Sequence, residues 1–477
     1  MIFDSENRED GWFRDRVFDV CIVGSGPAGI TLARTLARHG RDVGIFEGGG
    51  RELTPESQAL YAGEVIGGRY AALDQARLRY FGGTSNHWNG WTRPLDAWDF
   101  SPHPANPHSG WPISKTDLDP YAAETDEILD LKPAAPAAFP IDLSPLAPLA
   151  FAFSPPTRFR PKYVEELIGT KNLRLYLNAN LVRIGLDERR RTVAQLHFKS
   201  FRHDEEFSVR AKYFALCLGG IENPRALLNT QGTDRHAIGN EHDLVGRYFC
   251  EHLHYGLGHI LYKQPLDLYF LGPKPGFLDR ARVNSFGLRL TRAPLRPVQQ
   301  AQCLSPEARK VAEAIGALPE CAVPGELRIA SEQALNPESR VQLIDAVDRF
   351  GWRRIALDWR LSEVDLRTVR TAALEAAKIF AQHDLGRIKL TGWIADATVP
   401  PPRIGEDEVI GYHHMCTTRM SADPAQGVVD ANCRLHDVEN LYLGGSSVFA
   451  TAGHSNPTYT IVQLALRLGD HLHRELG

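Results

Sequence analysis

The chain of 477 residues lacks long hydrophobic runs and carries little excess charge of either sign. A membrane-spanning helix needs about 20 consecutive apolar residues, and no such run is present. The polar, acidic first ten residues lack the basic start and apolar core of a secretory signal. A formal net charge of −4 gives no electrostatic basis for binding nucleic acid. These absences favour a globular protein with no membrane span and no nucleic-acid partner.

Cysteine is also scarce, with seven residues and no Cys-x-x-Cys pair. Neither a disulfide framework nor a zinc knuckle is indicated, and a reducing cytoplasm is the simplest location. Glu251, His252 and His254 are close enough in sequence to suggest a metal site. On a strand, however, the two histidines share a face from which Glu251 points away. Because a metal site needs convergent ligands, we expect no bound metal.

The composition itself is ordinary, with 43% hydrophobic and 23% charged residues. These values are typical of globular proteins. A chain of this length can bury a sizeable core and is expected to form two lobes.

Residues 17–47 have the pattern of a dinucleotide site. A short apolar strand over 17–23 runs into the turn Gly-Ser-Gly-Pro-Ala-Gly, and an amphipathic helix and a second strand follow. In this G-x-G-x-x-G pattern the first glycine permits the tight turn, the second lets the backbone approach a pyrophosphate, and the third brings the helix close to the sheet. The acid that ends the second strand can accept hydrogen bonds from a ribose. The predicted contacts are Gly24, Gly26, Pro27, Ala28, Gly29 and Glu47.

Residues 77–91 are dense in glycine, hydroxyl and aromatic side chains. The paired glycines Gly82 and Gly83 would let the backbone lie against a flat ring or a phosphate. Further glycine turns follow apolar strands at Gly219 and Gly445. Near the end of the chain, Asn456 is placed to cap a helix and Pro457 suits its first position.

These segments resemble the glucose-methanol-choline (GMC) oxidoreductases, a family of FAD enzymes that oxidise alcohols. The stretch Gly-Gly-Thr-Ser-Asn-His-Trp at 82–88 is similar to the flavin-linking segment of pyranose oxidase. The family pattern His-x-x-Gly-Thr-x-Arg-Met, followed by Asn-Pro, occurs at 413–420 and 456–457, with Cys416 in place of glycine. The resemblance implies FAD as cofactor, with further contacts at Gly82, Gly83, Thr84, Asn86, His87, Trp88, Val182, Gly219, Gly445, Asn456, Pro457 and Thr458.

The resemblance also implies catalytic roles. His413 would take the hydroxyl proton of the substrate, and Asn456 would orient the alcohol oxygen. His414 is an alternative base or a substrate contact, and His454 would touch either the substrate or only its own turn. His87 would either bond covalently to the flavin or pack against it. The two alternatives for each of the last two histidines stay open at this point.

The expected fold is α/β, with a discontinuous Rossmann-like FAD-binding domain over 1–101, 156–256 and 401–477. Residues 102–155 would form a lid or connection. Residues 257–400 would form an α+β substrate domain, with strands at 326–330, 340–343 and 354–359 in one antiparallel sheet and an amphipathic helix over 365–382.

The expected reaction is FAD-dependent oxidation of a hydroxyl to a carbonyl on a sugar, glycoside, aminoglycoside or cyclitol. Oxygen or another acceptor would then take the electrons. Three alternatives stay open. They are oxidation of a non-sugar alcohol, a nicotinamide-dependent dehydrogenase, and a lyase in which FAD is structural.

Overall fold

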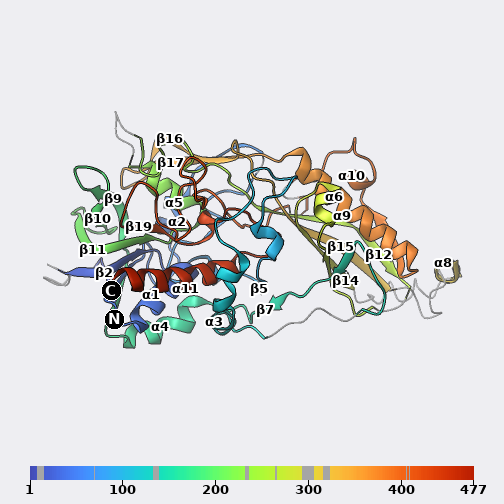
Figure 1. The fold of residues 1–477 in the computed structure, drawn as a ribbon, viewed down its shortest axis with the longest axis horizontal. Helices are drawn as coiled ribbons and strands as arrows, with labels where there is room; N and C mark the ends of the chain where they lie inside the picture. The colour runs from blue at the N-terminus through green and yellow to red at the C-terminus, as the bar shows by residue number, and fades with distance from the viewer. Residues whose placement is uncertain are drawn as a thin grey trace.

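The computed structural model describes residues 1–7, 16–68, 70–132, 139–230, 236–263, 266–292, 306–314, 323–403, 406–407 and 409–477. Cys303 and Cys321 lie outside these ranges. The molecule is elongated, with a mainly parallel sheet at one end and an antiparallel sheet at the other (Figure 1). Within the described ranges, no helix is both long and apolar enough to cross a membrane.

A parallel sheet forms the centre of the first lobe. Its strands, in order, are β1 (Ile2–Asp4), β8 (Leu173–Leu177), β3 (Val43–Phe46), β2 (Val17–Val23), β11 (Phe207–Leu216) and β19 (Leu441–Leu443). The antiparallel strands β10 (Val193–Lys199) and β9 (Asn180–Leu186) extend it beyond β11. The strand, glycine turn, helix and strand predicted at 17–47 are confirmed as β2, α1 (Pro27–Arg38) and β3.

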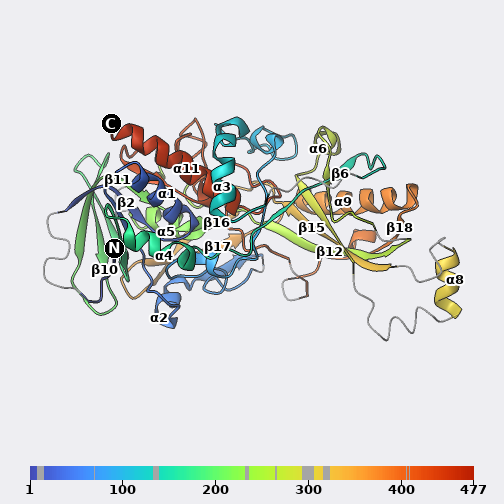
Figure 2. The same cartoon turned by 90° about the horizontal axis from the view of Figure 1, so that it is seen from below.

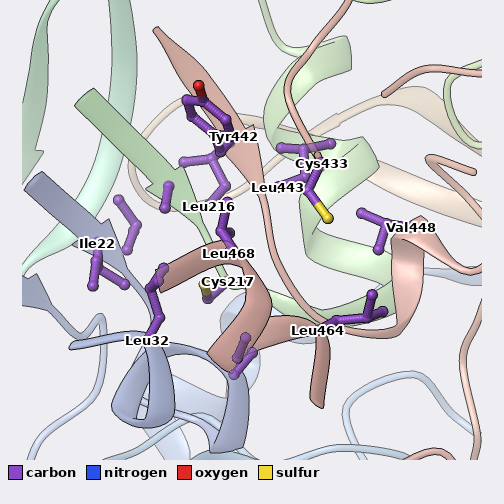
Figure 3. Close-up of a cluster of buried hydrophobic side chains, with 14 of the residues drawn as sticks. Ile22, Leu32, Leu216, Cys217, Cys433, Tyr442, Leu443, Val448, Leu464 and Leu468 are labelled. Carbon is purple, nitrogen blue, oxygen red and sulfur yellow. The ribbon is translucent and has the colours of Figure 1, made fainter. Parts of the chain in front are cut away.

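The main core lies between this sheet and two helices, α1 and α11 (Thr458–Glu475). Ile22 of β2, Leu216 of β11 and Leu468 of α11 meet there (Figure 3). The helices cross closely, because a Cβ added at Gly469 of α11 would lie 2.6 Å from Thr35 Cγ2 of α1. Burial on both faces explains why the central strands are almost wholly apolar.

An antiparallel sheet forms the second lobe. Its strands, in order, are β18 (Gly386–Leu390), β12 (His252–Tyr262), β15 (Val323–Glu332), β14 (Phe286–Arg292), β13 (Phe270–Pro273) and β6 (Leu146–Pro148). The predicted amphipathic helix is present as α9 (Glu363–Gln382) and packs on one face of this sheet (Figure 2). The opposite face of β12, β14 and β15 contributes residues to a large cavity.

The prediction that the strands within 326–359 share one antiparallel sheet is wrong. Only β15 belongs to the large sheet, whereas β16 (Arg340–Val347) and β17 (Arg353–Trp359) pair with each other and with β4 (Glu64–Gly67). Strand β16 packs beside α5 (Gly219–Leu228) of the first lobe. A strand's own sequence reports its packing surface and not which strand it pairs with.

The remaining helices and strands are short. They are α2 (Pro55–Gln58), α3 (Ala122–Ile128), α4 (Phe159–Gly169), α6 (Phe277–Ala281), α8 (Pro306–Ala314), α10 (Gly392–Ala395), β5 (Trp91–Thr92) and β7 (Ala152–Phe153).

Candidate active site

A cavity of about 570 Å³ connects the two lobes. Its lining includes the glycine turn 24–28, the 83–91 segment, and residues of the two C-terminal segments, 410–414 and 456–458. The second lobe contributes residues of β12, β14 and β15. Segments that are hundreds of residues apart in sequence therefore share one enclosed space of a size usual for ligand sites.

The glycine turn has the geometry that a dinucleotide site requires. Gly24 adopts a φ of +102°, a conformation that favours glycine. A Cβ at Gly29 would collide with the Gly24 carbonyl oxygen, whereas one at Gly26 would meet nothing within 4 Å. Gly29 is therefore needed for packing, and Gly26 leaves open space at the start of α1, where backbone N–H groups favour a phosphate.

Glu47 at the end of β3 lines the same cavity. Its Oε2 accepts hydrogen bonds from the backbone N (3.0 Å) and Oγ (2.7 Å) of Ser25, and its Oε1 accepts one from the Gly49 backbone N (2.9 Å). A carboxylate offers about four acceptor sites. Glu47 thus fixes the turn and keeps capacity for a ribose hydroxyl.

The 82–88 segment lies directly on the glycine turn. Gly82 and Gly83 have φ angles of +92° and +55°, and a Cβ at Gly83 would lie 3.2 Å from Gly26 Cα. Gly83, Thr84, His87 and Trp88 line the cavity, whereas Gly82 and Asn86 do not. The Asn86 amide donates instead to the Phe81 carbonyl (2.9 Å). The cradle of backbone that only glycine permits fits a flat, phosphate-bearing cofactor such as FAD.

Besides Gly82 and Asn86, two more predicted cofactor contacts lie off the cavity wall. Gly219, Gly445, Pro457 and Thr458 line the cavity, but Val182 does not, and its neighbour Leu181 does. The Val182 carbonyl accepts a hydrogen bond from the Trp352 indole. Gly29 does not line the cavity either, and its role is to let α1 pack closely against the glycine turn.

Several cavity residues were not found from the sequence. Arg225 Nη2 forms an ion pair with Asp348 Oδ2 (2.7 Å), and Glu222 bridges Arg225 (3.1 Å) and Arg77 (2.9 Å). These buried charges line the cavity beside Trp352. No local pattern marks them, because the 348–352 turn lies more than 300 residues from the glycine turn.

His413 and Asn456 meet on the cavity wall. The Asn456 Nδ2 atom lies 3.4 Å from His413 Nε2. Burial lowers the pKa of His413 well below its usual value, and the neighbouring histidines lower it further. Asn456 does not cap α11 as expected, because the helix begins at Thr458 and its first residues receive no side-chain cap. The amide faces the histidine instead.

The two other C-terminal histidines differ in position. His414 lines the cavity and packs near the rings of Tyr70 and Phe249, and burial lowers its pKa to about 3. His454 does not line the cavity. Its Nδ1 lies 2.7 Å from Ser285 Oγ and its Nε2 lies 3.2 Å from Arg93 Nη1. It therefore holds its own turn, and no part of it reaches the space open to a substrate.

Glu251 and His252 hold the segment that carries His413. The Glu251 carboxylate accepts from the backbone N of His413 (2.7 Å) and of His252 (2.9 Å), and from the Tyr70 hydroxyl (2.5 Å). Burial raises the pKa of Glu251 to about 6. Within the part of the chain that the structure describes, no group of three or more His, Cys, Asp or Glu side chains is arranged to hold a metal.

The cavity ends at the sheet of the second lobe. Trp91, Phe270 and Arg289 line it there, with the Arg289 guanidinium 4.5 Å from the centre of the Trp91 ring. Arg328 also lines it and pairs with Asp407 (3.0 Å). Aromatic faces and hydrogen-bond donors are thus presented opposite His413 and Asn456.

The Rossmann-type sheet, the glycine cradle and the histidine–asparagine pair are those expected of an FAD-dependent oxidoreductase that acts on alcohols. Sequence models of two families match the chain: GMC oxidoreductase at residues 336–465 and NAD(P)-binding Rossmann-like domain at residues 22–51. Residues 336–465 are thus similar to the GMC oxidoreductases.

Relatives with assigned activities are distant. The chain is 24% identical to 2-methyl-1,2-propanediol dehydrogenase of Mycolicibacterium austroafricanum, over 96% of both chains. It is 23% identical to 6'''-hydroxyparomomycin C oxidase of Streptomyces lividus, over 95% of this chain and 91% of that one. The crystal structure of pyridoxine 4-oxidase from Mesorbium loti shares the fold, with a TM-score of 0.57 and 17% identity over 96% of this chain and 99% of that one.

Proposed function

We propose that the enzyme oxidises a hydroxyl group of a sugar-like substrate to a carbonyl, with His413 as the base. The observation that carries this proposal is the 3.4 Å approach of Asn456 Nδ2 to His413 Nε2 on the wall of the cavity that holds the glycine cradle. An alcohol oxygen placed between these two nitrogens would face a proton acceptor and a hydrogen-bond donor.

Each side chain has a defined task in this proposal. His413 Nε2 accepts the hydroxyl proton, and the Asn456 amide donates a hydrogen bond to the alcohol oxygen as negative charge grows on it. Bound FAD supplies the acceptor for the hydride that leaves the adjacent carbon. General-base assistance of this kind is typically worth about 10²- to 10⁴-fold in rate.

The residues that would hold FAD are those that line the cavity around the cradle. The N-terminus of α11 also lies on this wall, where the helix dipole and the backbone N–H groups from Thr458 onward favour negative charge. The full set is Gly24, Gly26, Pro27, Ala28, Glu47, Gly83, Thr84, His87, Trp88, Gly219, Gly445, Pro457 and Thr458.

His87 is a candidate for a covalent bond to the flavin. It lines the cavity, and burial and the nearby Arg158 lower its pKa. A neutral imidazole is the form that can act as a nucleophile. Acid precipitation decides the matter, since flavin released wholly into the supernatant means that His87 only packs against the cofactor.

Two observations bear on the substrate. The Trp91 face and the guanidinium groups of Arg289 and Arg328 suit a polyol, which needs donors and an apolar ring face together. Aminoglycoside oxidases and a fructose dehydrogenase are among the relatives. A short diol is the second candidate, because one relative that matches 96% of the chain is 2-methyl-1,2-propanediol dehydrogenase.

The test is an anaerobic screen for flavin reduction by sugars, glycosides, aminoglycosides, cyclitols and short diols. We expect a sugar-like alcohol to bleach the flavin absorbance, and reoxidation with oxygen or an artificial acceptor then identifies the electron acceptor. Bleaching by diols alone would replace the sugar assignment. Failure of every alcohol would favour a structural role for FAD.

A further inference from the structure

We propose that His252 is a positioning residue that fixes the tautomer of His413, accepting a hydrogen bond from His413 Nδ1–H so that Nε2 stays free to take a proton. The inference rests on the proposed role of His413 as the base. It gives a function to the Glu251–His254 segment, whose sequence first suggested a metal site.

The contact between the two histidines is direct. His252 Nδ1 lies 2.9 Å from His413 Nδ1, and the rings meet edge to face, with centroids 5.0 Å apart. His252 is 0% exposed, at the first position of β12. Two ring nitrogens at this distance form a hydrogen bond only if one, and not both, carries the proton.

The contact with Asn456 shows which nitrogen carries it. An amide Nδ2 only donates hydrogen bonds, so the Asn456 contact requires His413 Nε2 to be the acceptor. In neutral His413 the proton is then on Nδ1, from which it is donated to His252 Nδ1. His252 must in turn carry its own proton on Nε2. The backbone carbonyls of Ala452 and Gly453 lie beside that ring and favour a proton there, although no well-formed hydrogen bond is made.

The partner of the base is therefore a neutral acceptor. Burial lowers the pKa of His252 to about 3, so it does not hold a second proton in the working pH range. When His413 gains the substrate proton, its Nδ1–H becomes the donor of a charge-assisted bond, which is roughly twice as strong as a neutral one. A carboxylate in this position would raise the basicity of His413 further, because it would add a negative charge beside the imidazolium.

Other ionisable groups surround the pair. His254 and His414 lie near His413 and help to lower its pKa, and the Glu251 carboxylate accepts from the His413 backbone N. On β15, Glu332 is the partner of His252 in the strand register, and burial raises its pKa to about 8. Glu251 and His252 thus hold His413 through its backbone and its ring respectively.

The test compares three substitutions of His252 in the FAD-loaded enzyme. An Asn side chain can place an acceptor oxygen where Nδ1 lies, an Asp places a charged acceptor there, and a Leu removes the acceptor. We expect His252→Leu to slow anaerobic flavin reduction by about 10- to 100-fold, the usual cost of losing an orienting partner. His252→Asn should recover most of that loss.

The pH profile tests the contact between position 252 and the His413 ring. Reduction requires unprotonated His413, so the rate falls as pH drops through the pKa of that residue. His252→Asp should raise this pKa and move the acidic limb to higher pH, because a nearby negative charge favours the imidazolium. A purely structural role predicts instead that His252→Asn slows reduction as much as His252→Leu does. His103→Asn is the matched control, since His103 is a buried histidine stacked on Trp98 away from the cavity.

A second measurement does not depend on turnover. Nitrogen NMR of the holoenzyme labelled in histidine should show His413 protonated at Nδ1 in the wild-type protein and a mixture of tautomers in His252→Leu, with unchanged FAD content. A proton on His413 Nε2, or wild-type rates and pH limb in His252→Leu, would overturn the proposal. If no alcohol reduces the flavin, the proposed reaction fails while the NMR result still decides the tautomer.

Discussion

At the scale of single residues, two buried acids lie against the turn that precedes Asn456. Glu332 is 0% exposed, and its Oε2 accepts from the Ser285 backbone N (3.2 Å). Asp99 lies on the same turn, since a Cβ at Gly453 would lie 2.9 Å from its Oδ2. Burial, reinforced by the mutual repulsion of the two acids, raises the pKa of Glu332 to about 8, and burial raises that of Asp99 to about 7.

These raised pKa values predict how stability depends on pH. The folded protein keeps a proton on Glu332 at pH values where the unfolded chain, with an ordinary pKa of 4.5, has lost it. Stability should therefore fall as pH rises from roughly 4.5 to 8, by about 1.4 kcal/mol per pH unit for each such proton. Glu332→Gln should flatten this slope in denaturant titrations at pH 5, 7 and 8.5. An unchanged slope would show that Glu332 is ionised in the fold.

Removal of the base is the direct test at His413. We expect His413→Ala to slow anaerobic flavin reduction by about 10²- to 10⁴-fold, because the hydroxyl proton then has no acceptor. The flavin spectrum and FAD content should stay as in the wild-type enzyme. A rate within a few-fold of wild type would remove His413 from the role of base.

Sequence patterns predicted which residues gather at the site more successfully than the direction in which each side chain points. The spacing predicted that the two C-terminal segments could meet, and the contact between His413 and Asn456 exists. It did not predict that His454 would turn toward Ser285 or that Asn456 would leave α11 uncapped. Those orientations depend on partners from β14 and from the 410–415 segment, which no local pattern specifies.

At the scale of elements, the glycine turn offers a matched pair of substitutions. A Cβ at Gly26 meets no protein atom within 4 Å, whereas one at Gly29 collides with the Gly24 carbonyl. Gly26→Ala should therefore leave the apoprotein as stable as wild type but weaken FAD binding, because the added methyl occupies the space for the pyrophosphate. Gly29→Ala should lower stability itself. Thermal unfolding with and without FAD distinguishes the two, and equal FAD affinity in Gly26→Ala would place the phosphates elsewhere.

The pairing of strands from distant parts of the chain is the part of the fold that the sequence did not predict. The β2–α1–β3 unit and α9 were predictable because each has a local period and a local boundary signal. The partnership of β17 with β4 was not, since their paired residues, such as Ala356 and Glu64, are nearly 300 positions apart. As a result, no local sequence pattern predicts that the turn carrying Asp348 and Trp352 lines the cavity.

The buried ion pair on that turn supports a prediction of its own. Asp348→Asn removes one of the two carboxylates that pair with the buried Arg225, and breaking a buried pair typically costs about 3–5 kcal/mol. Asp345→Asn on β16 is the control, because its 3.3 Å contact with Arg353 is exposed and should contribute less than about 1 kcal/mol. Chemical denaturation measures both. Equal effects would show that the Arg225 pair adds nothing specific.

At the scale of the whole molecule, the cavity is built by both lobes, so FAD binds only to the folded chain. A ligand present at 100 times its dissociation constant adds about 2.7 kcal/mol to the free energy of unfolding. We expect the melting temperature of apoprotein to rise with FAD concentration, most steeply near the dissociation constant. If His87 bonds to the flavin, the rise should become irreversible on dialysis, whereas full reversal would indicate a non-covalent cofactor.

The close crossing of α1 and α11 at Gly469 and Thr35 has a consequence for how substrate and product travel. The start of α1 follows the glycine turn and the start of α11 follows Asn456. One packed helix pair therefore fixes the glycine turn relative to the residue proposed to orient the alcohol. The opposite wall depends on β13 and on β6, a three-residue edge strand. The local opening that admits a substrate should therefore occur in that wall. Backbone amides of β6 and β13 should then exchange with solvent faster than those of α1 and α11.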